Sequence, residues 1–443
     1  GDTRLMFMQS NGGLTDASLF HGRDCILSGP AGGVVGAVRT TAMANFEKII
    51  CFDMGGTSTD VSHYAGNFER AFESQVAGVR MRAPMMHIHT VAAGGGSILH
   101  FDGARFTVGP DSAGANPGPT CYRRGGPLTV TDCNVMLNKL IPEFFPKVFG
   151  PNGDEPLDRS VVVEKFKCLA NQITNTNDET MTPEEVAEGY LTIAVENMAN
   201  AIKKISIQRG YDVSEYVLSS FGGAGGQHAC LVADALGMKQ VFLHPLAGVL
   251  SAYGMGLADV RAMREQAVEA ILDDKLISKM ESGLNELAAN GFTELKSQDI
   301  ADDRISILRK VHIRYQGTDT ALVVDFGDRD GIVQAFEDKH RQQFGFIDNS
   351  KSHVIEAISI EAIGAGESVI DQPIVETGRG RIDTIPPLAL VQAYISGEYH
   401  NTPIIDRNHL RPGDKINGPA ILREDTATTL IELGWQGELS GVG

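Results

Sequence analysis

The chain has 443 residues, of which 42% are hydrophobic and 21% are charged, with a formal net charge of −18 at pH 7. This composition is typical of a globular protein, and the length predicts two or three domains. No apolar run approaches the length of a membrane-spanning helix. A negative charge of this size argues against sequence-independent binding of nucleic acid, because it would repel phosphates.

Six cysteines are spread along the chain without a CxxC pair, and the first residues lack the apolar segment of a secretory signal. This pattern argues against a zinc ribbon or a secreted disulfide framework and indicates reduced thiols. We therefore expect a cytoplasmic protein. Glycine is enriched, with 50 residues in the whole chain and most of them in its first 260 residues, which predicts tight turns or backbone that approaches a ligand.

The first half of the chain contains clear helix and strand signals. Small residues over 28–42 indicate a helix, and a buried strand at 49–52 precedes a glycine turn and a returning strand at 60–64. Residues 67–150 have the character of strands and loops. Thr182 is followed by a proline and two acidic residues, which predicts the start of a helix that continues to about residue 209.

The second half begins with a strand at 216–221, a glycine turn, a helix at 227–236 and a buried strand. Residues 264–295 indicate an acidic amphipathic helix or a pair of helices. The predicted elements that follow are strands at 305–315, 320–326 and 353–363, a polar linker near 378–380, and short strands with Pro/Gly turns over 385–443.

The strongest candidate site is the segment DMGGTSTD, which runs from Asp53 to Asp60. Its first carboxylate ends a buried strand and precedes the hairpin residues Gly55, Gly56, Thr57, Ser58 and Thr59. Glycines let backbone N–H groups approach phosphate oxygens, and hydroxyls add donors. A carboxylate in this position can hold Mg²⁺ through water. The alternative is an ordinary glycine-rich hairpin.

A second glycine motif, FGGAGG, lies between a strand and a helix, and it contains Gly222, Gly223, Ala224 and Gly225. It lacks the GxGxxG register of a dinucleotide fingerprint and the acidic partner that follows one. A glycine turn at the start of a helix still suits a nucleotide. By itself this signal is weak.

Histidines supply a candidate metal site, although structural histidines are the alternative that spacing favours. His87 and His89 fall on one face of a strand and could share a metal, while His100 lies beyond the AAGGGS turn. No third ligand is set by spacing. His228 heads a predicted helix, where it either meets a nucleotide or caps the helix.

The other reactive residues have ordinary structural interpretations. Cys121 lies in a glycine-rich loop without a visible base beside it, so a structural thiol is expected rather than a nucleophile. Asp111 and Asp132 fit turns, and the acidic pair Asp273 and Asp274 fits a solvated surface.

The order of segments resembles the second half of the ATPase fold shared by actin, sugar kinases and heat-shock chaperones. In that order a connecting helix precedes a phosphate hairpin, an adenosine loop and a second connecting helix. The two connecting helices cross closely there, which implies small side chains at Gly33, Gly36, Ala37, Ala252, Gly254 and Gly256.

Within that superfamily the chain is similar to the hydantoinase A/5-oxoprolinase family. The resembling segments include LSGPAGGVVGA, FDMGGTSTDVS, TVAAGGGSI, VGPDSAGANPGPTCYRRGGPLTVTD, FGGAGGQHAC, HPLAGVLSAYGMGLAD, RYQGTDTALVV and GPAILREDTATTL. They extend over nearly the whole chain. The resemblance implies an α/β ATPase lobe at 1–262 with a strand-rich insertion at about 67–180, an α+β region at 263–370 and a small β domain at 371–443.

Two parts of the family pattern are not seen in this sequence. The family has an earlier phosphate hairpin, which nothing before Asp53 supplies, and the hydantoinase B-like half does not follow. We therefore expect a fragment of the A half that does not turn over ATP alone. The family also often has an acid where His87 stands, which weakens a site there.

The resemblance implies ATP-dependent opening of a cyclic amide, with 5-oxo-L-proline giving L-glutamate, ADP and phosphate. It assigns Asp53 to water-mediated Mg²⁺ and the 55–59 turn to phosphate, while Asp60 orients the hairpin or a water. Residues 222–225 would pack against adenosine. K⁺ is a further expected cofactor, the B-like half an expected partner, and the parent protein an expected homo-oligomer.

Three other functions remain open at this point. An enzyme of the same family could open a hydantoin, as an N-methylhydantoinase does, or carboxylate a ketone, as acetone carboxylase does. A non-catalytic module could bind nucleotide as a switch and move a partner. A small-metabolite kinase would instead release a stable phosphorylated product. The nucleotide motifs do not separate these possibilities.

Overall fold

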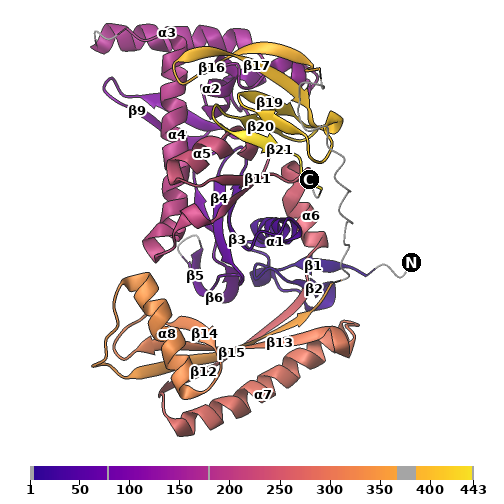
Figure 1. Cartoon of the computed structure of the whole chain (residues 1–443), viewed down its shortest axis with the longest axis vertical. Coiled ribbons are helices and arrows are strands. Elements are labelled where there is room, and N and C mark those ends of the chain that lie inside the picture. Colours follow the sequence, from indigo (N-terminus) through magenta and orange to yellow (C-terminus); the bar gives the residue numbers. More distant parts are fainter. Residues whose placement is uncertain (1–3, 77–78, 178–179, 367–385, 442–443) are drawn as a thin grey trace.

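The computed structural model describes residues 4–76, 79–177, 180–366 and 386–441, which form a mixed α/β molecule elongated along one axis (Figure 1). Helices and sheets are interspersed along the chain. The described α-helices are α1 (Ser28–Met43), α2 (Val130–Met136), α3 (Arg159–Asn177), α4 (Pro183–Ile205), α5 (Ala229–Leu236), α6 (Leu250–Gly256), α7 (Asp274–Ser297) and α8 (Arg329–Phe344). Within those ranges, none is both long and apolar enough to cross a membrane.

A five-stranded sheet lies at the centre of the molecule and has the order β11-β10-β3-β4-β7. Strands β3, β10 and β11 run parallel, and β4 and β7 continue the sheet in antiparallel fashion. The strands are β3 (Lys48–Met54), β4 (Thr59–Ala65), β7 (His89–Val91), β10 (Val217–Phe221) and β11 (Gln240–Phe242).

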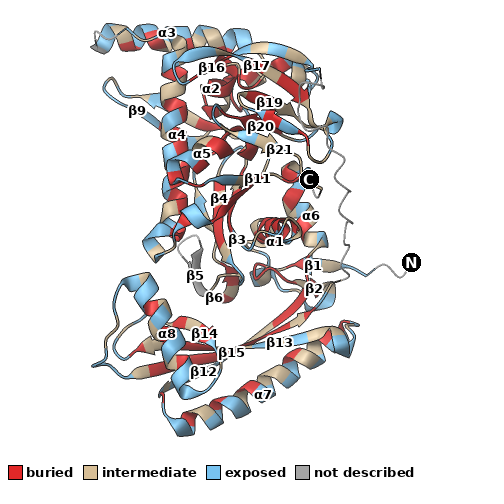
Figure 2. Cartoon of the chain, viewed as in Figure 1, coloured by how far each residue is buried: buried red, intermediate tan, exposed pale blue. Residues whose placement is uncertain are grey.

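Both faces of this sheet are covered, because alternate residues of β3 enter two different cores. Ile50, Phe52 and Met54 pack in the core that contains α4. Ile49 and Cys51 pack in the core that contains α1. Figure 2 shows the resulting buried residues on the central strands and on α1. The sheet therefore supports the 55–58 turn that follows β3 from a well-packed core.

A six-stranded sheet forms the lower part of the view in Figure 1 and has the order β1-β2-β12-β15-β13-β14. Helices α7 and α8 pack on it through a separate apolar core. Its strands are β1 (Met6–Met8), β2 (Leu14–Asp16), β12 (Val260–Ile271), β13 (Ile305–Tyr315), β14 (Leu322–Asp325) and β15 (His353–Gly364).

The remaining strands form two hairpins and the C-terminal β structure. The hairpins are β5 (Arg70–Val76) with β6 (Val79–Met86), and β8 (Ser97–Phe101) with β9 (Phe106–Ser112). The C-terminal strands are β16 (Ala389–Ile395), β17 (Glu398–Asp406), β18 (Lys415–Asn417), β19 (Ala420–Arg423), β20 (Thr428–Ile431) and β21 (Gln436–Glu438). Figure 1 places them beside α5 and β11.

Helices α1 and α6 cross at very short distance, as the small residues predict. A Cβ atom on Gly254 would lie 2.0 Å from the carbonyl oxygen of Gly32, and one on Gly36 would lie 2.7 Å from that of Leu250. Ala252 and Gly256, by contrast, are exposed. A Cβ atom on Gly256 would meet nothing within 4 Å, so the expectation that these two must be small was wrong.

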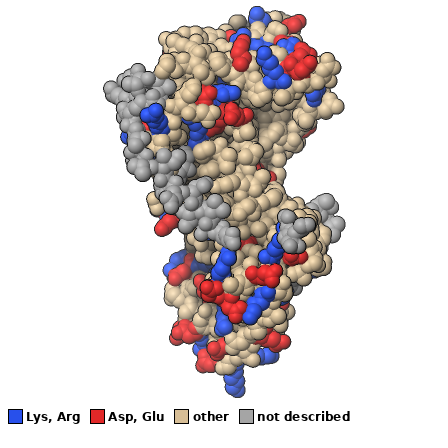
Figure 3. Space-filling model, turned by 90° about the vertical axis from the view of Figure 1, so that its right-hand side faces the viewer, with Lys and Arg blue, Asp and Glu red and all other residues tan. Residues whose placement is uncertain are grey.

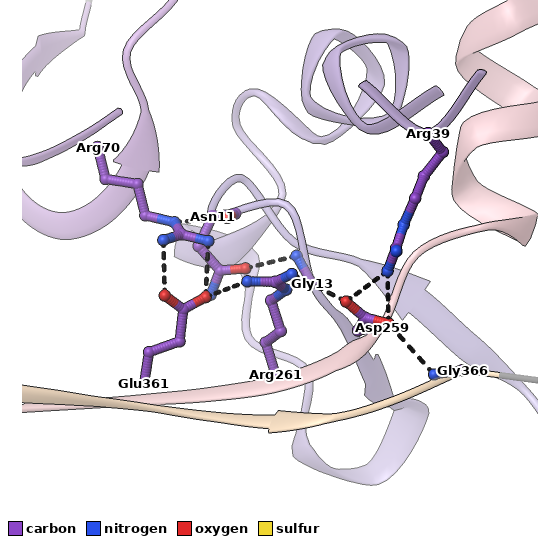
Figure 4. A network of polar contacts seen from close by, with 8 residues as sticks. All are labelled: Asn11, Gly13, Arg39, Arg70, Asp259, Arg261, Glu361 and Gly366. Atoms are coloured by element: carbon purple, nitrogen blue, oxygen red, sulfur yellow. Dashed lines mark hydrogen bonds and ion pairs between the residues drawn. The ribbon is translucent and has the colours of Figure 1, made fainter. Parts of the chain in front are cut away.

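A charge network, buried except for the exposed Arg39, joins the six-stranded sheet to α1 and to the β5–β6 hairpin (Figure 4). Arg70 donates two hydrogen bonds to Glu361, at 2.7 and 2.8 Å. Arg261 bridges Glu361 and Asp259, and Arg39 donates to both oxygens of Asp259. Paired guanidinium and carboxylate groups hold these segments in one relative position.

Most predicted elements are present, but residues 264–295 were predicted wrongly in part. The first eight residues of that range belong to β12, which pairs with β15 along almost its whole length. The helix begins only at Asp274, with the side chain of Asp273 as its cap. Pairing with a distant strand overrides the local helical pattern here. The predicted linker at 378–380 lies outside the described residues.

Three helices were not predicted: α2 and α3, which lie within the insertion expected to be rich in strands, and α8, which lies between two predicted strands in a stretch left unassigned. Helix α2 has only seven residues, too few for a helical period to stand out.

The face shown in Figure 3 carries charges of both signs toward its two ends and mostly uncharged residues at the narrower middle.

Candidate nucleotide site

Asp53 and Asp60 face each other across the β3–β4 hairpin. They are directly paired in the antiparallel register, so their side chains leave the same face of the sheet. The Ser251 hydroxyl of α6 lies 3.5 Å from Asp53 Oδ2. The Thr90 hydroxyl donates to Asp60 Oδ1 at 2.6 Å. The two carboxylates that the sequence singled out therefore lie together at one end of the central sheet.

Burial controls the electrostatics of this acidic pair. It raises the pKa of Asp53 to about 6, and the charge of Asp60 contributes in the same direction. Burial also raises the pKa of Asp60, partly offset by the hydrogen bond from Thr90. Two carboxylates with raised pKa values gain from a nearby cation, because a positive charge stabilises their ionised forms.

The turn between the two carboxylates presents unused donors. Gly55 closes the turn by donating to the carbonyl of Ser58 at 3.1 Å. In the described part of the chain, the N–H groups of Gly56, Thr57 and Ser58 donate to no protein acceptor. A Cβ atom on Gly56 would meet nothing within 4 Å, so this side of the turn is open. Adjacent free N–H groups and hydroxyls suit phosphate oxygens.

A second glycine segment supports the turn from behind. The N–H groups of Gly95 and Gly96 donate to the carbonyls of Gly55 and Gly56 at 3.1 and 2.6 Å. A Cβ atom on Gly94 would lie 2.7 Å from the backbone nitrogen of Ser58. The AAGGGS run is therefore glycine-rich because two backbones touch there, which fixes the hairpin turn.

The FGGAGG turn lies directly beside Asp53. Gly222 has φ +80°, and a Cβ atom on it would lie 2.5 Å from Asp53 Oδ1. Ala224 donates its N–H to the Met54 carbonyl at 3.1 Å. A Cβ atom on Gly223 would meet nothing within 4 Å, whereas one on Gly225 would lie 2.7 Å from the Ser220 hydroxyl. The structure thus brings the two predicted glycine motifs together.

The predicted histidines lie outside the 53–60 hairpin, but His89 pairs with Val61 of β4, one residue beyond Asp60. His89 begins β7, and the N–H of His87 donates to the Glu69 carbonyl at 2.9 Å. Burial lowers the pKa of both. His100 instead pairs with Asp111 at 2.8 Å. Within the described ranges there is no cluster of three His, Cys, Asp or Glu side chains suited to a metal, so a metal at His87 and His89 stays a prediction.

His228 does not cap α5, although it stands at the cap position. It is 1% exposed, with Nε2 3.4 Å from the Asn134 amide nitrogen. Its Nδ1 atom is buried without a hydrogen-bond partner. Burial, with a smaller effect of the charge on Lys139, lowers its pKa to about 3. The imidazole is therefore neutral under ordinary conditions.

Asp132 and Cys121 serve the structure of a loop. Asp132 accepts from the N–H groups of Thr120 and Cys121 at 3.0 and 2.8 Å, and from Thr129 in a capping box. Burial raises the pKa of the Cys121 thiol, with the charge of Asp132 acting in the same direction. A thiol held protonated in this way is a poor nucleophile, which agrees with the expected structural role.

Sequence reasoning missed the residues that hold the site from other elements. Ser251 approaches Asp53 from α6, and Thr90 binds Asp60 from β7. Thr131, at the start of α2, donates from both its N–H and its hydroxyl to the Gly95 carbonyl at 2.8 Å. These are isolated serine and threonine side chains whose roles depend on contacts between distant segments, so no local pattern marks them.

The candidate site is therefore a carboxylate pair framed by two glycine turns at one end of the central sheet. A family model described as hydantoinase/oxoprolinase matches residues 1–264, and one described as the hydantoinase/oxoprolinase C-terminal domain matches residues 271–441. The chain belongs to the hydantoinase/oxoprolinase family.

Curated relatives include two 5-oxoprolinases. The chain is 42% identical to the 5-oxoprolinase of Saccharomyces cerevisiae, over 97% of this chain and 34% of that protein. It is 40% identical to 5-oxoprolinase 1 of Arabidopsis thaliana, over 98% of this chain and 35% of that protein. The chain thus spans about a third of the length of these relatives.

The solved structures that resemble the chain include a caprolactamase and an acetone carboxylase. The ATP-dependent caprolactamase of Pseudomonas jessenii has a TM-score of 0.87 at 28% identity, covering 99% of this chain and 64% of that one. A nucleotide-free acetone carboxylase has a TM-score of 0.73 at 22% identity, covering 99% of this chain and 63% of that one. The second likeness concerns the fold alone.

Proposed function

We propose that this chain is the nucleotide-binding portion of an enzyme that hydrolyses a cyclic amide at the expense of ATP. The observation that carries the proposal is the Asp53–Asp60 pair at the end of β3, framed by the 55–58 turn and by Gly222. The relatives named 5-oxoprolinase and the caprolactamase structure support a lactam as the substrate class. Among lactams we propose 5-oxo-L-proline, with L-glutamate as the product.

In this proposal the chain is one lobe of an actin-like ATPase, with α1 and α6 as its connecting helices. Their close crossing at Gly36 and Gly254 supports that arrangement. The free N–H groups of residues 56–58 would bind phosphate oxygens, and Gly223 would leave room for the adenosine.

The acidic pair fits a hydrated divalent cation, because burial raises both pKa values and a nearby positive charge would stabilise the ionised carboxylates. Bound Mg²⁺ would offset charge on the phosphates during transfer. Asp53 would hold the ion through water, and Asp60, held by Thr90, would orient the turn or a water. K⁺ is a further proposed cofactor.

The chemistry requires activation of a poor electrophile, since the lactam nitrogen donates electrons into the carbonyl. Attack of the lactam oxygen on the γ-phosphorus breaks the bond to ADP and forms a phosphorylated imidate. Water then adds to that carbon, and the C–N bond breaks so that the amine leaves with a proton and an acyl phosphate remains. A second water attacks the acyl carbon, phosphate leaves, and the free amino acid is formed. The chain's groups position the phosphates and stabilise their charge, and we assign the hydrolytic step to a hydantoinase B-like partner half.

The test is ATP hydrolysis by the complete gene product, with 5-oxo-L-proline, caprolactam, a hydantoin or no added substrate. We expect ADP release that 5-oxo-L-proline stimulates, and a loss of about 100-fold or more in Asp53→Asn. The control is Asp274→Asn, because Asp274 is an exposed acid at the start of α7.

Each contrary result points elsewhere. Stimulation only by the hydantoin would move the substrate to that class. A folded protein that binds ATP without stimulation by any lactam or hydantoin would refute the proposed reaction. Unchanged hydrolysis in Asp53→Asn would remove Asp53 from the site.

A further inference from the structure

A cavity of about 510 Å³ opens beside helix α3, and it is distinct from the candidate nucleotide site. It is lined by the loop that follows Pro119, by the segment around Glu155 and Asp158, and by Lys165 of α3. The loop belongs to the run NPGPTCYRRGGP, which the nucleotide site does not use. Its volume falls within the ordinary range for small-molecule sites.

Positive charge and a free donor converge on one wall of this cavity. The Lys165 ammonium donates to two uncharged oxygens, the Gly126 carbonyl at 2.6 Å and the Thr120 hydroxyl at 3.2 Å. Gly126 is buried, yet its N–H donates to no acceptor in the described ranges. A buried N–H without a partner is rare in folded proteins. Together these groups fit the oxygens of an anion.

Two carboxylates and a second cation also line this cavity. Arg123 pairs with Asp158 at 2.9 Å and with Glu155 at 3.5 Å. The Glu155 side chain is 42% exposed, so it is accessible to a ligand. Two cations and two carboxylates line the cavity, so their charges sum to zero. A dianion such as phosphate would upset that balance, whereas a zwitterion would keep it.

The wall that holds the free donor is fixed before any ligand arrives. The Thr120 hydroxyl donates to the Gly126 carbonyl at 3.0 Å. The buried carboxylate of Asp132 accepts from the N–H groups of Thr120 and Cys121. A site whose groups are already in place loses little entropy when it binds.

We propose that this cavity binds an α-amino acid. The ligand carboxylate contacts the Lys165 ammonium and the Gly126 N–H, and the ligand ammonium contacts the Glu155 carboxylate. Pro151 and Val161, which also line the cavity, contact the side chain of the ligand. Binding here requires no nucleotide, and so it is independent of the proposed ATP reaction.

Isothermal titration calorimetry of the whole chain with L-glutamate tests the site, with N-acetyl-L-glutamate and inorganic phosphate as comparison ligands. We expect L-glutamate to bind, and N-acetyl-L-glutamate, which lacks the ammonium, to bind about tenfold more weakly or worse. Lys165→Met should weaken the binding of L-glutamate by at least a similar factor. Lys167→Met, an exposed lysine on the same helix, should leave binding unchanged.

Glu155→Gln provides a second test that does not depend on the buried wall. It should weaken L-glutamate but leave the affinity for N-acetyl-L-glutamate unchanged, which a general loss of structure would not do. The proposal is overturned if L-glutamate produces no saturable heat at millimolar concentration, or if phosphate binds more tightly. It is overturned equally if a folded Lys165→Met variant, or Glu155→Gln, binds L-glutamate like the wild type.

Discussion

Asp53 is a partly buried carboxylate and His228 a buried imidazole, and burial moves their pKa values in opposite directions. It raises the pKa of Asp53 to about 6 and lowers that of His228 to about 3. In each case burial favours the neutral form. Asp53 sits where a cation would reverse this preference. His228 contacts Asn134, and burial there favours the neutral imidazole.

His228 should make the protein less stable in mild acid. Its pKa is near 6.5 in the unfolded chain and about 3 when folded. Between these values the unfolded state binds the extra proton, so this stability is complete above pH 6.5 and falls as pH drops toward 3. The loss should be on the order of 3 kcal/mol by pH 4.5.

Urea unfolding at pH 7.5 and pH 4.5 measures this effect. His228→Gln, which does not titrate, should lose less stability between the two pH values than the wild type. His409→Gln, at an exposed histidine, is the control and should behave like the wild type. An equal pH dependence in wild type and His228→Gln would contradict the assignment.

The crossing of α1 and α6 determines how the elements of the candidate site meet. The glycines at the crossing let the helix backbones touch, which brings Ser251 at the start of α6 to Asp53 at the end of β3. The small-residue pattern of both helices is explained by this contact. This contact also distinguishes Gly36 and Gly254, which have no room for a side chain, from Gly256, which has room.

Gly254→Ala should destabilise the fold, since its new methyl group would lie 2.0 Å from the Gly32 carbonyl oxygen. Forcing the helices apart should cost about 1–3 kcal/mol. Gly256 is the last residue of α6 and has open space around it, so Gly256→Ala should be neutral or slightly stabilising. Urea midpoints measure both; similar losses for the two variants would show that the crossing is not the cause.

The molecule as a whole is held together by the charge network that joins its lower sheet to α1 and the β5–β6 hairpin (Figure 4). Glu361 is central, because it accepts from both Arg70 and Arg261. Its side chain is 6% exposed. Removing one partner from a buried pair leaves an uncompensated charge, which costs far more than the loss of a surface pair.

Glu361→Gln should therefore lower the free energy of unfolding by about 3–5 kcal/mol. Glu215→Gln removes an exposed partner of Lys48, whose side chain is 49% exposed, and should cost less than about 1 kcal/mol. Thermal and urea unfolding report the difference. Equal effects would mean that the network does not hold the parts together.

Much of the fold was predictable from sequence because its signals are local. The capping box at Thr182 marks the start of α4, and the apolar run before Asp53 marks β3. The elements that were predicted wrongly depend on pairing with distant segments of the chain. Strand β12 is recognisable only through its pairing with β15, since its own residues fit a helix as well as a strand.

The sequence by itself determined the chemistry of the candidate site, since the acid, glycine and hydroxyl residues of 53–60 and 222–225 are contiguous in the chain. Only the tertiary structure decided which groups surround them. Thr90, Ser251 and the 94–96 turn reach the hairpin from other elements. The cavity beside Lys165 likewise joins segments about 40 residues apart. The physical reason is that sequence patterns report neighbours along the chain, whereas burial and charge balance depend on neighbours in space.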